Sequence, residues 1–232
     1  MRKYLIILVL SVIALSLNAQ SVLLEEDVNY YEDIPETGPN RKHYYHFYGS
    51  WGVMFGATEN NRSAIKPLLS YHYNLGFRYK RKLSNFYSLG YELTLGNKNF
   101  RLADDGARTI PAEKHYDKEK INMYSFGIGV YNRFNFGKRG NYIGKFLDIG
   151  AYGKWNYASR YFYKHETSDD EKRKFSQYNP DYINPLQYGV FARIGFNNIV
   201  IFGRYRLSEL IDTDTYVDLP VYTAGVQFGF HK

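Results

Sequence analysis

The sequence predicts an all-β fold, an eight-stranded antiparallel up-and-down β-barrel that spans a membrane. Three observations lead to this prediction: eight segments alternate between apolar and polar residues, the connections alternate between short and long, and aromatic residues are abundant. The 232 residues include 25 Tyr, 16 Phe, 2 Trp and 20 Gly, yet the mean hydropathy is only −0.48. A transmembrane barrel accounts for both values, because one face of each strand meets lipid while the other face can be polar.

The first 19 residues have the features of a secretory signal peptide. Arg2 and Lys3 form a basic start, an apolar run follows over residues 4–17, and Ala19 is a small residue suited to cleavage. The alternative is a membrane anchor, but the run is shorter than the ~20 residues that a spanning helix needs. The chain has no cysteine, which excludes a lipid-anchored lipoprotein and a disulfide framework.

Residues 20–43 are predicted to form an acidic periplasmic arm that precedes the barrel of residues 44–232. Six acidic and two basic side chains give the arm a net charge of −4. Pro35, Gly38 and Pro39 argue against regular structure. The arm is either a solvated tail or a docking segment for a basic partner.

Each predicted strand alternates with period 2 and is long enough to cross a membrane, which takes about 9–11 tilted residues. The last strand exposes an edge, and the first strand is the natural cover for it, which closes the ring. The eight strands are predicted at 44–58, 68–80, 86–98, 121–137, 145–163, 186–197, 199–210 and 220–232.

The connections indicate the orientation of the barrel. Outer-membrane barrels have short periplasmic turns and longer outer loops. Both the arm and the C-terminus are therefore expected on the periplasmic side. The predicted short turns are 81–85, 138–142 and 197–198, and the predicted outer loops are 59–67, 99–120, 164–185 and 211–219.

Aromatic residues gather near the predicted strand ends, where membrane proteins place girdles of amphipathic rings. The alternative is the core of a Tyr-rich sandwich, which would bury many hydroxyl groups without partners. The predicted girdle residues are Tyr44, Tyr45, Tyr79, Phe86, Tyr87, Phe134, Phe136, Tyr161, Tyr163, Phe228 and Phe230.

From Tyr44 to Lys232 the chain resembles small outer-membrane β-barrels, in particular the eight-stranded outer membrane protein beta-barrel domain proteins of Bacteroidota. The cleavage site after residues 17–19 is similar to sites common in that phylum. The ending 228–230, Phe-Gly-Phe, resembles the aromatic signal read by the barrel assembly machinery, although His231 and Lys232 follow it. A more distant resemblance is to PorT-like barrels of the type IX secretion and gliding apparatus.

The resemblance implies a location in the outer membrane of a Gram-negative bacterium. Expected contacts are outer-membrane lipid and lipopolysaccharide, the barrel assembly machinery, and a protein of a secretion or envelope complex. The net charge of +7 would suit nucleic acid, but the basic residues fall in the barrel wall and in turns such as 78–82 and 138–139. No nucleic-acid partner is therefore predicted.

The inward faces of the strands carry charges, six basic and two acidic. Eight strands leave an interior just wide enough for side chains to fill, so these charges must pair or stay hydrated. An ion-pair plug is preferred to a transport path, with Glu92 reaching Arg78 or Arg133, and Asp148 reaching Arg133 or Arg193. The predicted lumen charge cluster is Arg78, Glu92, Arg133, Asp148, Lys154, Arg193, Arg204 and Arg206.

The sequence gives little indication of catalysis. His115 and His165 lie in predicted outer loops, close in sequence to Asp117 and to residues 168–170, but a nucleophile, a base and an acid must meet in space. His72 is expected inside the barrel as a hydrogen-bonded residue. There is no Gly-rich phosphate loop, HExxH motif or metal-spaced cluster, so no catalytic residue, cofactor or metal is predicted.

The predicted function is a non-catalytic structural or interaction component, which anchors surface loops or the periplasmic arm to a partner complex. A lipid-modifying outer-membrane enzyme is the alternative. A diffusion pore is a third possibility, which a filled lumen disfavours.

Overall fold

The computed structural model describes residues 38–56, 65–102, 118–137, 140–166, 172–211 and 218–230. Within them lie one 3-10 turn, Pro67–Leu69, and nine strands. None of the helices in these residues is long and apolar enough to cross a membrane. The predicted signal peptide and most of the predicted arm lie outside the described residues. The strands are β1 His43–Phe55, β2 Tyr71–Lys82, β3 Tyr87–Arg101, β4 Lys118–Phe136, β5 Lys145–Glu166, β6 Lys172–Tyr178, β7 Leu186–Phe196, β8 Ile199–Arg206 and β9 Tyr222–Phe230.

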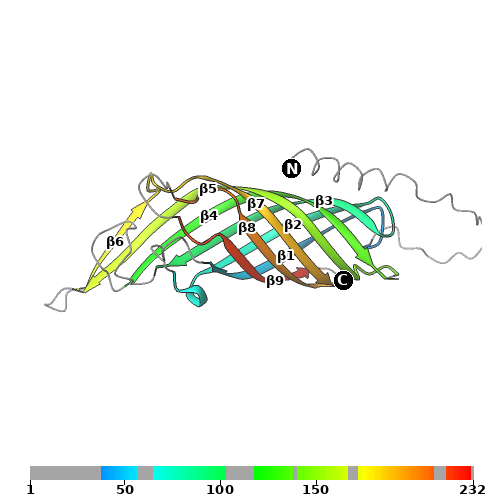
Figure 1. The fold of residues 1–232 in the computed structure, drawn as a ribbon, viewed down its shortest axis with the longest axis horizontal. Coiled ribbons are helices and arrows are strands. Elements are labelled where there is room, and N and C mark those ends of the chain that lie inside the picture. Colours follow the sequence, from blue (N-terminus) through cyan, green and yellow to red (C-terminus); the bar gives the residue numbers. More distant parts are fainter. Residues whose placement is uncertain are drawn as a thin grey trace, which may run out of the picture. The chain divides into compact units, whose positions relative to one another are not determined.

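Eight of these strands close into an antiparallel ring in the order β1–β2–β3–β4–β5–β7–β8–β9 (Figure 1). The seam joins the first strand to the last, from Phe47 opposite Phe230 to Phe55 opposite Tyr222. Closure leaves no free edge within the ring. The predicted eight-stranded barrel is therefore confirmed.

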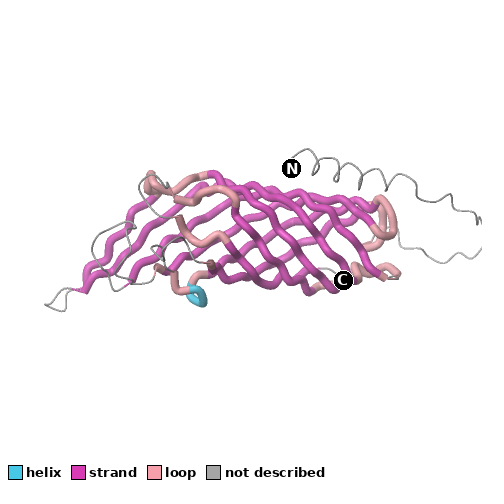
Figure 2. Tube along the Cα trace, in the orientation of Figure 1, coloured by secondary structure: helices cyan, strands magenta, loops and turns pink. Residues whose placement is uncertain are grey.

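The ninth strand, β6, is an addition to the ring. It pairs with the last part of β5, from Arg160 opposite Tyr178 to Glu166 opposite Lys172. The first residues of β4 pair with the same part of β5, so β4, β5 and β6 continue as a small sheet past the closed ring (Figure 2). The sequence predicted a loop over 164–185, because its polar residues show no apolar alternation.

The strands present an apolar face outward and a polar face inward. In β7 and β8 exposed and buried residues alternate without interruption. Ile194 and Ile201 are 68% and 64% exposed, whereas their neighbours Arg193 and Val200 are buried. Exposed aliphatic side chains beside buried arginines are the reverse of the distribution in a water-soluble protein, and this distribution fits a wall that faces lipid.

A β-bulge in β5 reverses the alternation near the loop end of the barrel. Tyr124 lies opposite Ala158 while Ser125 lies opposite Asn156, so Tyr157 is the extra residue. Beyond the bulge, Tyr161 points inward and is only 3% exposed. The prediction that Tyr161 belongs to the outer girdle was wrong, because period 2 alone does not reveal a change of phase.

Apolar side chains close the lumen at both ends. At the end with short turns, Ile143, Phe146 and Val200 are buried, and Tyr44 packs against them instead of joining the predicted girdle. At the loop end a larger cluster, the apolar cap, combines strand ends with residues predicted as loops. The apolar cap consists of Met54, Ile65, Phe100, Leu102, Ile121, Met123, Tyr161, Ile183, Leu210, Ile211 and Leu219.

Asp218 fixes the loop that contributes most to the cap. Its Oδ1 accepts hydrogen bonds from the backbone N–H groups of Leu210 (2.9 Å), Ile211 (3.2 Å) and its own neighbour Leu219 (2.8 Å). Its Oδ2 accepts one from Arg206 Nη1 at 2.8 Å. One carboxylate thus satisfies three backbone donors and a lumen cation, which holds these apolar residues inward.

Replacing Asp218 with alanine is expected to lower the free energy of unfolding by about 2 kcal/mol, since hydrogen bonds to a charged group are lost. Chemical denaturation in detergent micelles measures this change. Asp218→Asn is the matched control. Its amide oxygen can still accept hydrogen bonds from the backbone, so this variant should lose less stability than Asp218→Ala. Equal stability of Asp218→Ala and the unmodified protein would contradict this role.

Residues 38–42, which we call the mouth segment, lie across the end of the ring with short turns. Lys82 Nζ donates to the backbone oxygen and to Oδ1 of Asn40, at 3.2 and 3.0 Å, and Lys80 Nζ donates to Pro39 O. Asn40 Nδ2 in turn donates to Gly140 O, at 2.6 Å, in the turn between β4 and β5. The described end of the predicted arm is therefore packed onto the barrel.

Candidate functional site

All eight residues of the predicted lumen cluster point into the barrel, and each is more than nine-tenths buried. They come from six strands of the ring, because inward positions recur at every second residue. A cavity of about 10 Å³ beside Arg78 and Arg133 is large enough for one water molecule. Side chains thus occupy the surrounding space.

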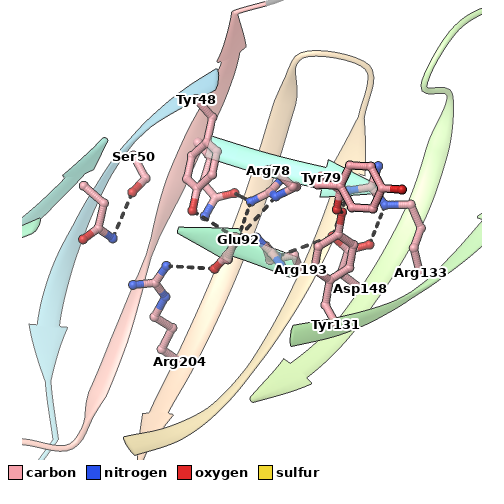
Figure 3. A network of polar contacts seen from close by, with 12 residues as sticks. Tyr48, Ser50, Arg78, Tyr79, Glu92, Tyr131, Arg133, Asp148, Arg193 and Arg204 are labelled. Atoms are coloured by element: carbon pink, nitrogen blue, oxygen red, sulfur yellow. Dashed lines mark hydrogen bonds and ion pairs between the residues drawn. The ribbon is translucent and has the colours of Figure 1, made fainter. Parts of the chain in front are cut away.

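Glu92 is the centre of the network (Figure 3). Its Oε2 accepts from Arg78 Nη2 at 3.1 Å and from Arg193 Nη1 at 2.5 Å, and the Tyr48 hydroxyl donates to the same oxygen at 3.1 Å. Arg204 Nη2 lies 4.0 Å from Oε1. One carboxylate is therefore surrounded by three guanidinium groups from β2, β7 and β8.

Asp148 forms the second ion-pair group. Arg133 donates through Nε to Oδ1 at 2.7 Å and through Nη2 to Oδ2 at 2.9 Å, a two-pronged contact. Arg193 Nε lies 3.4 Å from Asp148 Oδ2, so Arg193 links the two carboxylates. Arg133 does not reach Glu92, one of the two contacts expected for that carboxylate, because it lies directly opposite Asp148 in the register.

Aromatic rings support the arginines, and glycines make room for the rings. The guanidinium carbon of Arg78 lies 4.2 Å from the ring centre of Tyr48, and that of Arg133 lies 3.7 Å from the ring centre of Phe146. Such contacts partly replace lost hydration. Tyr48 lies opposite Gly76 in the neighbouring strand, where a Cβ atom would collide with the ring.

Sequence reasoning missed several buried ionisable residues. Lys98 lies on the inward face of β3, and Glu119 lies inward on β4, ahead of the predicted start of that strand. Lys80 was assigned to the periplasmic rim, but it is 1% exposed and bonds to Pro39. Lys80 and Lys98 fall on the inward phase at the ends of the predicted strands 68–80 and 86–98, and extending the alternation two residues ahead of Ile121 would have found Glu119.

The described residues provide no catalytic constellation. His115, Asp117 and residues 168–170 lie outside them, and His165 is placed only as a backbone position in β5. His72 is buried, with its Nε2 3.1 Å from Lys154 Nζ. In the part of the chain that is described, no three His, Cys, Asp or Glu side chains are grouped to hold a metal ion.

A second charged site lies on the outside of the sheet formed by β4, β5 and β6. Because of the bulge at Tyr157, the cations of β5 point outward there, next to the cations of neighbouring strands. Lys118, Lys164 and Lys174 are cross-strand neighbours in one row, and Arg101 and Lys120 lie opposite each other in the next. The outer cationic face consists of Arg101, Lys118, Lys120, Arg160, Lys164 and Lys174.

Aromatic and hydroxyl groups order this face. Lys120 Nζ lies 5.1 Å from the ring centre of Phe162, and the guanidinium carbon of Arg160 lies 5.1 Å from that of Tyr178. Arg160 Nη2 donates to Ser176 Oγ at 2.7 Å. None of the six cations has a carboxylate within 4 Å among the described residues. Like charges in adjacent strands destabilise a sheet, so this face is suited to an external anion.

The outer cationic face lies next to the lipid-facing wall, on the same outward side of β4. Tyr124 is 46% exposed on the outside of β4, and Lys120 lies four residues further along the same strand. At about 3.3 Å per residue, the backbone of Lys120 lies roughly 13 Å from that of Tyr124 along the strand, toward the loop end. A groove of about 250 Å³ beside it is lined by Tyr71, Arg101, Lys118, Lys120 and Phe162, among others.

Comparisons with known proteins give two similar solved structures and one matching family. The chain is similar to two crystal structures of Ail, the attachment invasion locus protein of Yersinia pestis, at 12% and 13% identity. They cover 80% and 82% of this chain and 97% and 99% of their own, with TM-scores of 0.34 and 0.36. One of them is a complex with the heparin analogue sucrose octasulfate. No curated protein matches the chain.

The family comparison covers the barrel almost completely. The profile of the outer membrane protein beta-barrel domain matches residues 23–222. This match spans most of the chain and agrees with the closed ring, the apolar outer wall and the polar lumen. An outer-membrane location and contact with outer-membrane lipid follow from it. The chain belongs to the outer membrane protein beta-barrel domain family.

Proposed function

We propose that the protein is a non-catalytic interaction component of the outer membrane, with its short turns and C-terminus in the periplasm and its β4–β5–β6 sheet at the cell surface. The observation that carries this proposal is the row Lys118, Lys164 and Lys174, three adjacent cations without a described carboxylate partner. Such a row is stable when a bound anion neutralises it.

The ligand that fits this face is the phosphorylated glycolipid of the outer leaflet, lipopolysaccharide. Its phosphate groups lie at the membrane surface. The outer cationic face lies just beyond the lipid-facing residue Tyr124 and would therefore be at the same level. Arginine and lysine supply charge-assisted hydrogen bonds to phosphate, and the ring of Phe162 offers an apolar surface to a sugar. The groove beside Tyr71 and Arg101 gives such a headgroup a concave site.

The lumen supports an anchoring role. A plug of ion pairs and two apolar ends hold the ring rigid without leaving an open bore, and a rigid ring fixes the sheet that carries the face. The proposal further includes recognition of the C-terminal strand by the barrel assembly machinery and a partner from a secretion or envelope complex. A Bacteroidota source and the distant likeness to PorT-like barrels stay predictions.

The test is binding of purified lipopolysaccharide to the mature barrel in phosphatidylcholine nanodiscs. The variant Lys118→Gln, Lys164→Gln, Lys174→Gln removes the row. A lysine at a charged membrane surface contributes about 1 kcal/mol, so the triple variant is expected to bind roughly 100-fold more weakly. The unmodified barrel should also bind less tightly as salt is added, since surface charges are screened.

The matched control replaces three exposed cations at the opposite end of the barrel, Lys42, Arg81 and Lys145, with glutamine. This control should bind as the unmodified protein does. Lipopolysaccharide stripped of its phosphates should bind all three proteins weakly. Equal binding by the two triple variants, or equal binding of intact and phosphate-free lipopolysaccharide, would refute the proposal.

A further inference from the structure

A layer of buried basic residues lies between the Glu92 network and the apolar cap. It contains His72 of β2, Lys98 of β3, Lys154 of β5 and Arg204 of β8, each more than nine-tenths buried. His72 lies directly opposite Lys98 in the register, and Lys154 Nζ lies 3.1 Å from His72 Nε2. Lys154 lies directly opposite Gln187 of β7, the residue that accepts the hydrogen bond of Lys98. We call these four residues the cationic layer.

Three carboxylates near the layer, Glu92, Asp148 and Asp218, are already engaged by other cations. Glu92 lies between Arg78 and Arg193, which leaves Arg204 at 4.0 Å, and Asp148 is held by Arg133 and Arg193. Asp218 pairs with Arg206. Within the described residues, Lys98 and Lys154 have no carboxylate within 4 Å.

The acceptors that the two lysines do have are neutral. Lys98 Nζ donates to Gln187 Oε1 at 2.5 Å, and Lys154 Nζ donates to Asn74 Oδ1 at 3.2 Å. An ammonium group has three N–H donors, so each lysine keeps donors to spare. A buried charge with only neutral partners is costly, because it has lost the water that solvated it.

Further donors in and beside the layer have no acceptor. Arg204 Nη1 and Gln187 Nε2 are buried without a hydrogen-bond partner, and so is Nδ1 of His72. They come from the neighbouring strands β7 and β8 and from β2. Buried polar groups in folded proteins are almost always satisfied, so unused donors clustered beside unpaired cations indicate a missing acceptor.

The cationic layer is enclosed on both sides along the barrel, so its positive charge is shielded from solvent. On the loop side, Met123 of the apolar cap lies directly opposite Lys98 in the register. On the other side, the network of Arg78, Glu92 and Arg193 fills the lumen. An acceptor must therefore be small enough to share a packed interior, and it must carry negative charge to balance the lysines.

We propose that the cationic layer binds one small inorganic anion of halide size, with chloride as the ligand. The anion accepts hydrogen bonds from Arg204 Nη1 and from the ammonium groups of Lys98 and Lys154. It supplies the charge that the carboxylates of the lumen do not. This site is separate from the outer cationic face and does not depend on it.

The direct test is crystallisation of the full mature barrel in bromide, followed by an anomalous difference map. Bromide replaces chloride at halide sites and scatters anomalously. A peak within hydrogen-bonding distance of Arg204 Nη1 and at least one of the two lysines is the expected result. A lumen without any bromide peak would overturn the proposal, and water or uncharged lysine would then explain the layer.

The second measurement is the thermal unfolding midpoint in detergent, in sodium chloride and in sodium gluconate of equal ionic strength. The midpoint is expected to be higher in chloride, because a ligand that binds only the folded state stabilises it. In Lys98→Met and in Lys154→Met the difference between the salts should disappear. Lys120→Met, which removes a cation from the outer face, should keep the difference.

Two separate lysine variants are used because one of them could fail to fold. Equal midpoints of the unmodified protein in both salts would contradict the proposal, as would a chloride effect of unchanged size in both lysine variants.

Discussion

Replacing Glu92 with alanine is expected to destabilise the barrel by about 3–5 kcal/mol, the largest effect that we expect from a single substitution in this protein. The substitution removes the only carboxylate in ion-pair contact with Arg78 among the described residues, and Arg193 loses its shortest ion pair. The Tyr48 hydroxyl loses its acceptor as well. Buried guanidinium groups without a carboxylate retain the full cost of desolvation, and alanine leaves a cavity beside them.

The measurement is equilibrium denaturation in detergent micelles with tryptophan fluorescence. Asp181→Ala serves as the matched control, because Asp181 is an exposed carboxylate in a turn and should change stability little. Asp148→Ala should lower the free energy of unfolding by an amount similar to Glu92→Ala, because Arg133 would lose both of its hydrogen bonds to Asp148. If Glu92→Ala and Asp181→Ala unfold at the same denaturant concentration, the lumen is hydrated and the ion pairs contribute little.

Gly76→Val is expected to destabilise the barrel by about 3 kcal/mol through overpacking. Gly76 lies opposite Tyr48, and a side chain at this position would occupy the space of the Tyr48 ring. The ring must then move, which breaks its hydrogen bond to Glu92 and its contact with Arg78. Valine has a high strand propensity, so any loss comes from the lumen and not from the strand itself.

Gly203→Val is the matched control for this change. Gly203 is also in the middle of a strand, but nothing lies within 4 Å of the position that its Cβ atom would take. This variant should be as stable as the unmodified protein. Combining Gly76→Val with Tyr48→Ala should recover part of the loss, because the smaller side chain vacates the space. Equal stability of Gly76→Val and Gly203→Val would refute the packing argument.

Alternation and loop lengths were enough to predict the ring. Period 2 is a local property of each strand, and residues such as Arg193 and Arg204 fall on the inward face as soon as the phase of the strand is known. The alternation of short and long connections supported an up-and-down barrel and predicted its orientation. Both signals need only residues that are close together in the chain.

Features that depend on pairing between distant residues could not be predicted in the same way. The bulge at Tyr157 exists only relative to β4, and period 2 looks intact on either side of it. The contact between Glu92 and Arg193 joins residues 101 positions apart. Several arginines lie within reach of Glu92, so alternation alone does not select the partners.

The apolar cap was missed for a related reason. Leu210, Ile211 and Leu219 belong to a predicted loop or its borders, where apolar residues follow no period and give no direction. What turns them inward is the set of hydrogen bonds to Asp218, a tertiary arrangement. The outer cationic face was missed because the bulge decides that Arg160 and Lys164 point outward.

The mouth segment changes how the ring resists deformation. Hydrogen bonds between strands connect each strand only to its two neighbours, so a ring of eight can flatten into an oval without breaking any of them. Asn40 ties Lys82, at the end of β2, to Gly140, in the turn that begins three strands away from β1. It therefore acts as a crossbar along a chord of the ring, from β2 to the turn between β4 and β5. The spacing between β2 and the β4–β5 turn, on which the Glu92 and Asp148 contacts depend, is thus braced from outside the sheet.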